Sequence, residues 1–298
     1  MPCQRTVARE VETAGVGLHT GLPVRIRLRP APAGTGVVFR RIDLNPPVRI
    51  AARADCVSDT HRSTSLSAGE VRVGTVEHLL AALSALQIDN VLVDVSAPEL
   101  PIMDGSAAPF VGLVQAAGTL EQEAPRRFLR VLREVAVADG DKLARFLPFD
   151  GFRVAFTIDF EQPVLRRTGT HAEFDISCQS FVDELSGART FGFLHEVEAL
   201  RARGLALGAG FENAVVLDTQ RVLNPEGLRF SDEFVRHKIL DALGDLALLG
   251  VPLQGEFRAI KSGHGLNNAA VRALLDQPDA WDLVPALQPV KAAVAGSG

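Results

Sequence analysis

The sequence predicts an α+β fold built from two halves of similar organisation. At 298 residues the chain is longer than most single domains, so two domains of roughly 130–150 residues each are expected. In each half the pattern runs in one order: strands, an apolar helix, a strand, a glycine-containing loop and a further helix. His78 and His237 lie on the long helices of the two halves, 159 residues apart. A duplicated α+β domain would explain this offset.

The composition excludes several functional classes. Hydrophobic residues make up 47% of the chain, which is enough for sizeable cores, and the net charge of −5 argues against nucleic-acid binding. Cys3, Cys56 and Cys178 are isolated, so neither a disulfide framework nor a thiolate zinc site is expected, and a reducing compartment fits. We expect no secretory signal and no integral membrane segment, and hence a soluble, cytoplasmic protein.

The elements of the first half follow from hydrophobic periodicity. Val24, Ile26 and Leu28 alternate with arginines, as in a strand with one solvated face. Thr75 is expected to cap the apolar helix that follows it. The predicted elements are strands within 23–54, a polar loop at 59–65, a helix at 76–86, a strand at 91–95, a loop at 98–105 and a helix at 106–117.

A polar segment with proline and glycine, residues 118–126, indicates a linker to the second half. Hairpin turns are expected at residues 139–141 and 150–151. Ser231 is expected to cap the long helix of this half, and Gly250 to end it. The predicted elements are strands at 128–137, 142–149 and 152–160, a helix at 231–249, a strand at 254–260, a loop at 261–265, a helix near 267–275 and a frayed end at 292–298.

Residues 186–213 have no counterpart in the first half. They mix large apolar side chains with five glycines. Such a segment is either ordinary packing or the wall of an apolar ligand channel, and its composition leaves both interpretations open.

The helix of the second half carries three polar residues spaced four apart: His237, Asp241 and Asp245. On a helix they form one stripe, with Ile239 and Leu243 on the core side. A histidine and an aspartate one turn apart are able to hold one metal ion. The alternative is a solvated polar face.

Glu77 and His78 begin a helix that is otherwise apolar on all sides. An ionisable pair there needs partners, because burial of unpaired charge is costly. One interpretation is a structural hydrogen bond between the two side chains. The other is a zinc ligand at His78 with Glu77 as general base, and His237 and Asp241 as further ligands. Three protein ligands leave one position open for water, which is the catalytic pattern.

His264 lies between glycines in a loop, where its imidazole could approach a substrate and Asp245 could orient it. A surface histidine is the alternative. His19, also flanked by a glycine-containing segment, is open to the same two interpretations.

Six motifs, occurring in order, carry a resemblance to a known family. They include Thr-Val-Glu-His-Leu, Ala-Arg-Thr-Phe-Gly-Phe and Lys-Ser-Gly-His-Gly-Leu-Asn-Asn, and they occupy residues 75–79, 102–110, 188–193, 222–230, 234–246 and 261–268. The chain from about residue 4 to 280 closely resembles the UDP-3-O-acyl-N-acetylglucosamine deacetylases. These are zinc amidases that commit Gram-negative bacteria to lipid A synthesis.

The resemblance implies a mechanism for this chain. It implies zinc, or ferrous iron in the same site, on His78, His237 and Asp241. Glu77 would be the general base and His264 the general acid, with Asp245 paired to that histidine. Lys238 and Thr190 would stabilise the oxyanion formed during amide hydrolysis.

The resemblance also implies a fold and a substrate site. The fold is two β-α-α-β sandwiches packed face to face, with the active site between them and an insert in each half. The domains would be residues 1–125 and 126–280, followed by a tail at 281–298, and the chain is expected to be a monomer. Residues of the insert at about 190–213 would surround the hydroxyacyl chain, and others would contact the nucleotide or sugar of an acylated UDP-GlcNAc. The substrate-binding residues implied are His19, Ser63, Lys142, Phe160, Phe191, Phe193, Leu200, Ala206, Gly210, Phe211 and Lys261.

One loop departs from the family pattern. Relatives often carry a cysteine where this chain has Ser63, and that cysteine can bind an inhibitory second zinc ion. Ser63 is a poorer ligand, so we predict weaker inhibition by excess zinc unless His61 substitutes. Zinc titration of the wild type against Ser63→Cys measures this, and equal inhibition would refute it.

Two other functions compete with deacetylation of this substrate. A non-catalytic sugar-nucleotide-binding protein would need a broken ligand set, but every ligand residue is present. An amidase for another N-acetylated sugar would have no use for the apolar insert.

Overall fold

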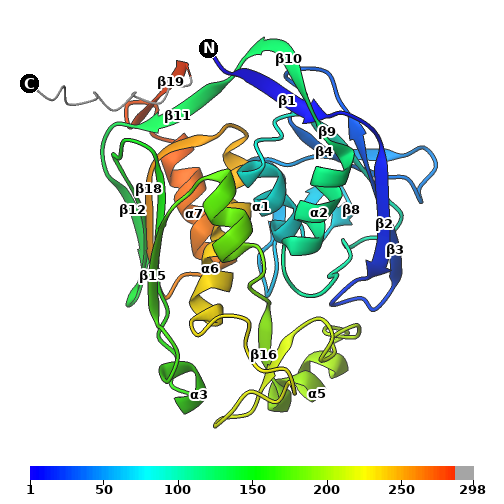
Figure 1. Ribbon diagram of the computed structural model, residues 1–298, viewed down its shortest axis with the longest axis vertical. Coiled ribbons are helices and arrows are strands. Elements are labelled where there is room, and N and C mark those ends of the chain that lie inside the picture. The colour runs from blue at the N-terminus through cyan, green and yellow to red at the C-terminus, as the bar shows by residue number, and fades with distance from the viewer. Residues whose placement is uncertain (286–298) are drawn as a thin grey trace, which may run out of the picture.

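The computed structural model describes residues 1–285 and has a mixed α+β architecture. Four helices lie between two sheets, one sheet from each half of the chain (Figure 1). They are α1 (Glu77–Ala85), α2 (Ala108–Ala117), α6 (Glu233–Leu246) and α7 (His264–Leu275). The helices carry the chemistry, and the sheets cover their outer sides.

The first half forms a five-stranded sheet in the order β2-β3-β9-β4-β5. Alternation in β3 buries Val24, Ile26 and Leu28 against the helices and leaves the arginines outside, as predicted. The strands are β2 (Val11–Val16), β3 (Pro23–Pro30), β9 (Val91–Val95), β4 (Val37–Arg41) and β5 (Val48–Ala51). A separate three-stranded sheet joins β6 (Val57–Asp59), β7 (Ser65–Ala68) and β8 (Val71–Val73).

The second half forms a seven-stranded sheet around β18 (Leu253–Ile260), which pairs with three neighbouring strands. One path runs β12-β13-β18-β11-β19, and β14 and β15 extend from β18. The other strands are β11 (Arg127–Val131), β12 (Val135–Asp139), β13 (Lys142–Leu147), β14 (Phe152–Thr157), β15 (His171–Asp175) and β19 (Trp281–Pro285). Residues 281–285 of the predicted tail therefore pair with β11, and residues 292–298 lie outside the described residues.

The predicted insert forms a small unit beside the helices, at the bottom of Figure 1. It consists of β16 (Phe191–Phe193), α5 (Leu194–Ala202) and a loop, and β16 pairs in parallel with β17 (Val215–Leu217). The second half also contains two short helices, α3 (Pro163–Arg166) and α4 (Cys178–Ser180), a π-helical segment at Phe181–Leu185 and a 3-10 turn at Ala247–Leu249. Within residues 1–285, no helix combines the length and hydrophobicity that crossing a membrane requires.

The predicted linker at 118–126 is wrong, because residues 119–125 form β10 (Thr119–Pro125), which pairs antiparallel with β1 (Cys3–Val7). Its polar composition reflects exposure of an edge strand. The single strand predicted at 128–137 is divided into β11 and β12.

The turn at 139–141 joins the antiparallel pair β12–β13, as predicted. The prediction of a hairpin at 150–151 is wrong, because β13 and β14 do not pair with each other and β18 lies between them.

Both predicted helix caps are wrong. Thr75 has a left-handed backbone, with φ of 54°, and its hydroxyl donates to Glu99 Oε1 at 2.8 Å. The long helix starts after Asp232, two residues later than the prediction from Ser231. Gly250 has φ of 77° and ends the turn that follows this helix, as predicted. For Thr75, the tertiary contact with Glu99 takes the hydroxyl that would have capped the helix.

A metal site and a catalytic cavity between the helices

Helices α1 and α6 pack closely, and this contact assembles the site. Gly244 lies where they cross, and a Cβ there would overlap the carbonyl oxygen of Glu77. The absence of a side chain lets the two backbones approach. His78, at the start of α1, thereby meets His237 and Asp241 on α6.

His78, His237 and Asp241 form a buried group whose donor atoms all lie within 4.8 Å of one another. The Nε2 atoms of His78 and His237 are 3.5 and 3.2 Å from Asp241 Oδ1. Burial lowers the pKa of His237 to about 3, so its imidazole is neutral, as a metal ligand must be. Burial acts against ionisation of Asp241, but the charged ammonium of Lys238 beside it helps to hold the pKa of that carboxyl well below its usual range.

The donor set fits a zinc ion. Two imidazoles and a carboxylate are the ligands of several catalytic zinc sites. The Nδ1 of His237 is 3.0 Å from the carbonyl oxygen of Ala188, and this hydrogen bond would direct Nε2 to the metal. Among the described residues Asp241 Oδ1 is buried without a hydrogen-bond partner, which is the expected state of an atom reserved for a cation.

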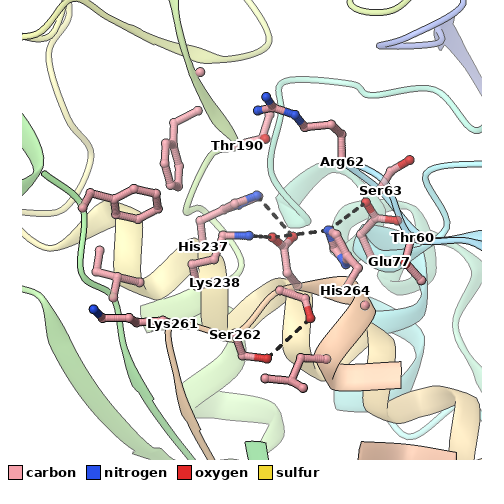
Figure 2. A pocket seen from close by; sticks show the side chains of 18 of the residues that line it. Thr60, Arg62, Ser63, Glu77, Thr190, His237, Lys238, Lys261, Ser262 and His264 are labelled. Carbon is pink, nitrogen blue, oxygen red and sulfur yellow. Dashed lines mark hydrogen bonds and ion pairs between the residues drawn. The ribbon is translucent and has the colours of Figure 1, made fainter. Parts of the chain in front are cut away.

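Glu77 and His264 stand beside this group (Figure 2). His264 Nε2 is 3.8 Å from Glu77 Oε1 and 3.9 Å from Asp241 Oδ2. Burial raises the pKa of the Glu77 carboxyl, although His264 and His78 act in the opposite direction. For His264 burial lowers the pKa, but Asp245 outweighs it and the pKa rises to about 9.

Asp245 orients His264 from behind. Its Oδ2 accepts from His264 Nδ1 at 2.9 Å and from Asn267 Nδ2 at 2.9 Å. Its Oδ1 accepts from the hydroxyl of Thr64 at 2.6 Å, and the backbone N–H of Thr64 donates to Glu77 Oε2 at 3.0 Å. Thr64 therefore connects the candidate base to the group behind the candidate acid.

His264 is the first residue of α7, and not part of a loop as predicted. Its imidazole is buried and held at Nδ1 by Asp245, so the surface interpretation is wrong. Lys238 donates to Asp241 Oδ2 at 2.7 Å, and this carboxylate raises the lysine pKa against the effect of burial.

A cavity of about 1030 Å³ opens over the metal group. His237, Lys238 and His264 converge on it, and Thr190 and Arg62 lie on one side in Figure 2. The predicted substrate-binding residues that line the cavity are Ser63, Lys142, Phe160, Phe191, Phe193 and Lys261.

The other predicted substrate-binding residues do not line the cavity. His19 is partly buried, its backbone N–H donates to Glu99 Oε1, and burial lowers the pKa of its imidazole. Ala206 is buried with φ of 53°, whereas Phe211 is 49% exposed. The set outside the cavity is His19, Leu200, Ala206, Gly210 and Phe211.

Several residues that line the cavity or support the catalytic groups could not be identified as functional from the sequence pattern. Thr64 and Asn267 act through Asp245; Thr64 lies beside Ser63 in the polar loop at 59–65, and Asn267 lies in the motif that contains His264. Arg62 forms an ion pair of 3.1 Å with Glu196 of α5, and both line the cavity. Lys261 is held at 2.7 and 2.6 Å by Asp141 and Asp159, which raise its pKa.

Comparison with known proteins agrees with this geometry. A family model described as UDP-3-O-acyl N-acetylglycosamine deacetylase (LpxC) matches residues 4–276. Curated relatives named UDP-3-O-acyl-N-acetylglucosamine deacetylase include those of Teredinibacter turnerae and Thioalkalivibrio sulfidiphilus. They are 57% and 58% identical over 281 residues, covering 94% of this chain and 93% and 92% of the relatives. The relative from Pseudomonas entomophila is 57% identical, with 94% of this chain and 93% of the relative covered. The chain therefore belongs to the UDP-3-O-acyl N-acetylglycosamine deacetylase family.

Proposed function

We propose that this protein is a metal-dependent deacetylase that hydrolyses the acetamide of UDP-3-O-acyl-N-acetylglucosamine, the deacetylation step of lipid A biosynthesis. The products are the free 2-amine and acetate. The observation that supports this most directly is the convergence of Glu77 and His264 on the buried His78, His237 and Asp241 group, in a chain of this family.

His78, His237 and Asp241 would hold the metal ion, which we propose to be zinc. When bound, zinc lowers the pKa of its water and polarises the amide carbonyl. His237 is already neutral and oriented by Ala188, so the site needs little rearrangement to accept the ion.

Glu77 acts as the general base. Its raised pKa brings the carboxylate closer to neutral working pH, where a base accepts a proton most effectively. The backbone N–H of Thr64 fixes one carboxylate oxygen and leaves Oε1 facing His264 and the cavity.

His264 acts as the general acid. With a pKa of about 9, its imidazolium is present at neutral pH and donates a proton from Nε2 to the departing amine. Asp245 holds Nδ1 and so fixes the direction of Nε2.

Lys238 and Thr190 stabilise the oxyanion that forms on the substrate carbonyl. An ammonium and a hydroxyl placed before the reaction favour the developing negative charge. Both residues line the cavity beside the metal group.

The insert binds the acyl chain. Leu194, Leu207 and Phe211 are large apolar side chains about half exposed, and they lie in the segment next to the cavity. Phe191 and Phe193 continue this apolar surface to the catalytic group. We propose that the hydroxyacyl chain covers these side chains and that Lys142, Phe160 and Lys261 contact the uridine diphosphate.

We also propose the arrangement and setting of the molecule. Residues 1–125 and 126–280 would be two related β-α-α-β domains facing each other across α1 and α6. The three cysteines are free in the described structure, which supports a reducing, cytoplasmic location. The proposed state of the enzyme is a monomer.

The test is deacetylase activity after removal and return of the metal. Activity on acylated UDP-GlcNAc is expected to disappear after chelation and to return with one equivalent of zinc, with ferrous iron as a parallel arm. A series of acyl lengths then tests the insert, because a chain too short to reach it should raise KM. Full activity of the metal-free protein would refute the proposal.

A further inference from the structure

Ala188 and Thr190, two residues apart in the chain, contact separate parts of the active site. The carbonyl oxygen of Ala188 accepts the hydrogen bond from His237 Nδ1 at 3.0 Å. The side chain of Thr190 lines the cavity, and its backbone N–H donates to the carbonyl oxygen of Gly105 at 2.8 Å. Any displacement of this segment would therefore alter a metal ligand and the candidate oxyanion donor together.

Between these two residues, Arg189 forms a buried ion pair with Glu233. Arg189 is 3% exposed and Glu233 is fully buried. The guanidinium donates to Glu233 Oε1 at 2.8 Å and Oε2 at 3.2 Å, and to the carbonyl oxygen of Gly227 at 2.7 Å. The backbone N–H of Arg189 also donates to Glu233 Oε1, at 3.0 Å, so the carboxylate fixes both the side chain and the main chain.

Glu233 is the first residue of α6, one helical turn before His237. Its second oxygen accepts from the backbone N–H of Arg229 at 2.6 Å, and the Arg229 guanidinium donates to the carbonyl oxygen of Gly187 at 3.0 Å. The Glu233 carboxylate thus connects the segment before Thr190 to the N-terminus of α6, the helix that carries two of the metal ligands.

Neither Arg189 nor Glu233 is among the residues that line the cavity. A buried ion pair adds little net stability compared with an apolar pair of similar size, because desolvation opposes its attraction. Its directed, bidentate geometry is what an apolar pair could not supply.

We propose that Arg189 and Glu233 are positioning residues for deacetylation: their buried ion pair sets Thr190 at a fixed place relative to the metal helix α6. This inference rests on the role of Thr190 given under Proposed function. It adds that the place of Thr190 depends on a pair that touches neither substrate nor metal.

The test uses the double variant Arg189→Met/Glu233→Gln. The two changes leave the net charge unaltered and create no unpaired buried charge, and the glutamine oxygen still accepts one backbone hydrogen bond. With zinc saturating, we expect kcat to fall about tenfold or more, because a displaced oxyanion donor loses much of its effect, and KM to stay within about twofold. Zinc content is measured in every sample.

A kinetic cycle with Thr190→Val shows whether the pair acts through Thr190. If it does, adding the pair variant to Thr190→Val should lower kcat by no more than about twofold further. The proposal would be overturned if the fold reductions in kcat of the pair variant and of Thr190→Val multiply in the combined variant. It would also be overturned by a wild-type kcat in the pair variant, or by a reduction in kcat that only follows zinc content. Wild-type activity of Thr190→Val alone would instead show that the proposed role of Thr190 is wrong.

Hydrogen exchange of the metal-free protein gives a readout that does not depend on activity. The amide of Thr190 should exchange faster in the pair variant, while amides in the centre of α6 keep their protection. The matched control is Arg130→Met/Asp282→Asn, which removes a partly exposed pair between β11 and β19. It should leave kcat and Thr190 exchange unchanged. Equal Thr190 exchange in the pair variant and the wild type would overturn the proposal.

Discussion

At the scale of single residues, the surroundings of two neighbouring ionisable groups favour different protonation states. Glu77 is buried, which favours its neutral form, while His264 is buried beside Asp245, which favours its charged form. The pKa of the Glu77 carboxyl is thereby raised toward neutral pH, and the pKa of His264 is raised above it, so that the imidazolium is the form present at pH 7. This division of roles is what an amide hydrolase needs.

Removal of either group tests that division. Glu77→Gln and His264→Asn should each lower kcat by about 10²–10⁴, because one proton transfer is lost while the fold is retained. Steady-state kinetics at saturating zinc, with circular dichroism as the control for folding, measures this. Near-normal turnover in either folded variant would contradict its assigned role.

Asp245→Asn should move the basic limb of the pH–rate profile. The His264 imidazolium exists below its pKa of about 9, so acid catalysis is present below that pH and is lost as pH rises through it. Asp245 is the principal cause of the increase, and a neutral amide should therefore shift the limb to lower pH. A profile of kcat from pH 6 to 10 measures it, and an unmoved limb would show that another group controls the alkaline loss.

At the scale of elements, the crossing of α1 and α6 depends on one glycine. Gly244 has no room for a Cβ beside the Glu77 backbone. Gly244→Ala should separate the helices, destabilise the fold by about 1–3 kcal/mol and weaken zinc binding.

Gly112→Ala on α2 is the matched control for that change. Nothing lies within 4 Å of a Cβ at this exposed position, so better helix propensity should stabilise the protein by about 0.5–1 kcal/mol. Urea unfolding of the metal-free variants compares the two positions. Equal stability of both would mean that the crossing accommodates a methyl group.

At the scale of the whole molecule, the metal group joins the two halves of the chain. His78 comes from α1, whereas His237 and Asp241 come from α6. A ligand that binds only the folded state stabilises it, by about 2.7 kcal/mol at a concentration one hundred times Kd.

Zinc should therefore raise the Tm of the metal-free protein in a concentration-dependent manner. His78→Ala should remove most of that response, because the ligand from the first half is lost. Calorimetry across a zinc titration measures the effect, and an equal increase in Tm for the variant would place the stabilising ion elsewhere.

The sequence by itself determined the features that depend on local period and composition. Alternation in residues 23–30 gives a strand with one buried face, and the four-residue spacing of His237 and Asp241 places both on one side of a helix. The ordered motifs identified the family, because each contains residues that a single chemistry needs.

Only the tertiary structure decided which distant segments meet. Three features rest on contacts between segments distant in sequence. They are the place of β18 between β13 and β14, the start of α6 at Glu233, and the support of His264 by Thr64 and Asn267. A linear pattern carries helix and strand periods, whereas strand order and helix crossings follow from packing of the whole core. For that reason the ligands were predictable one by one, and the positions of the groups that support them were not.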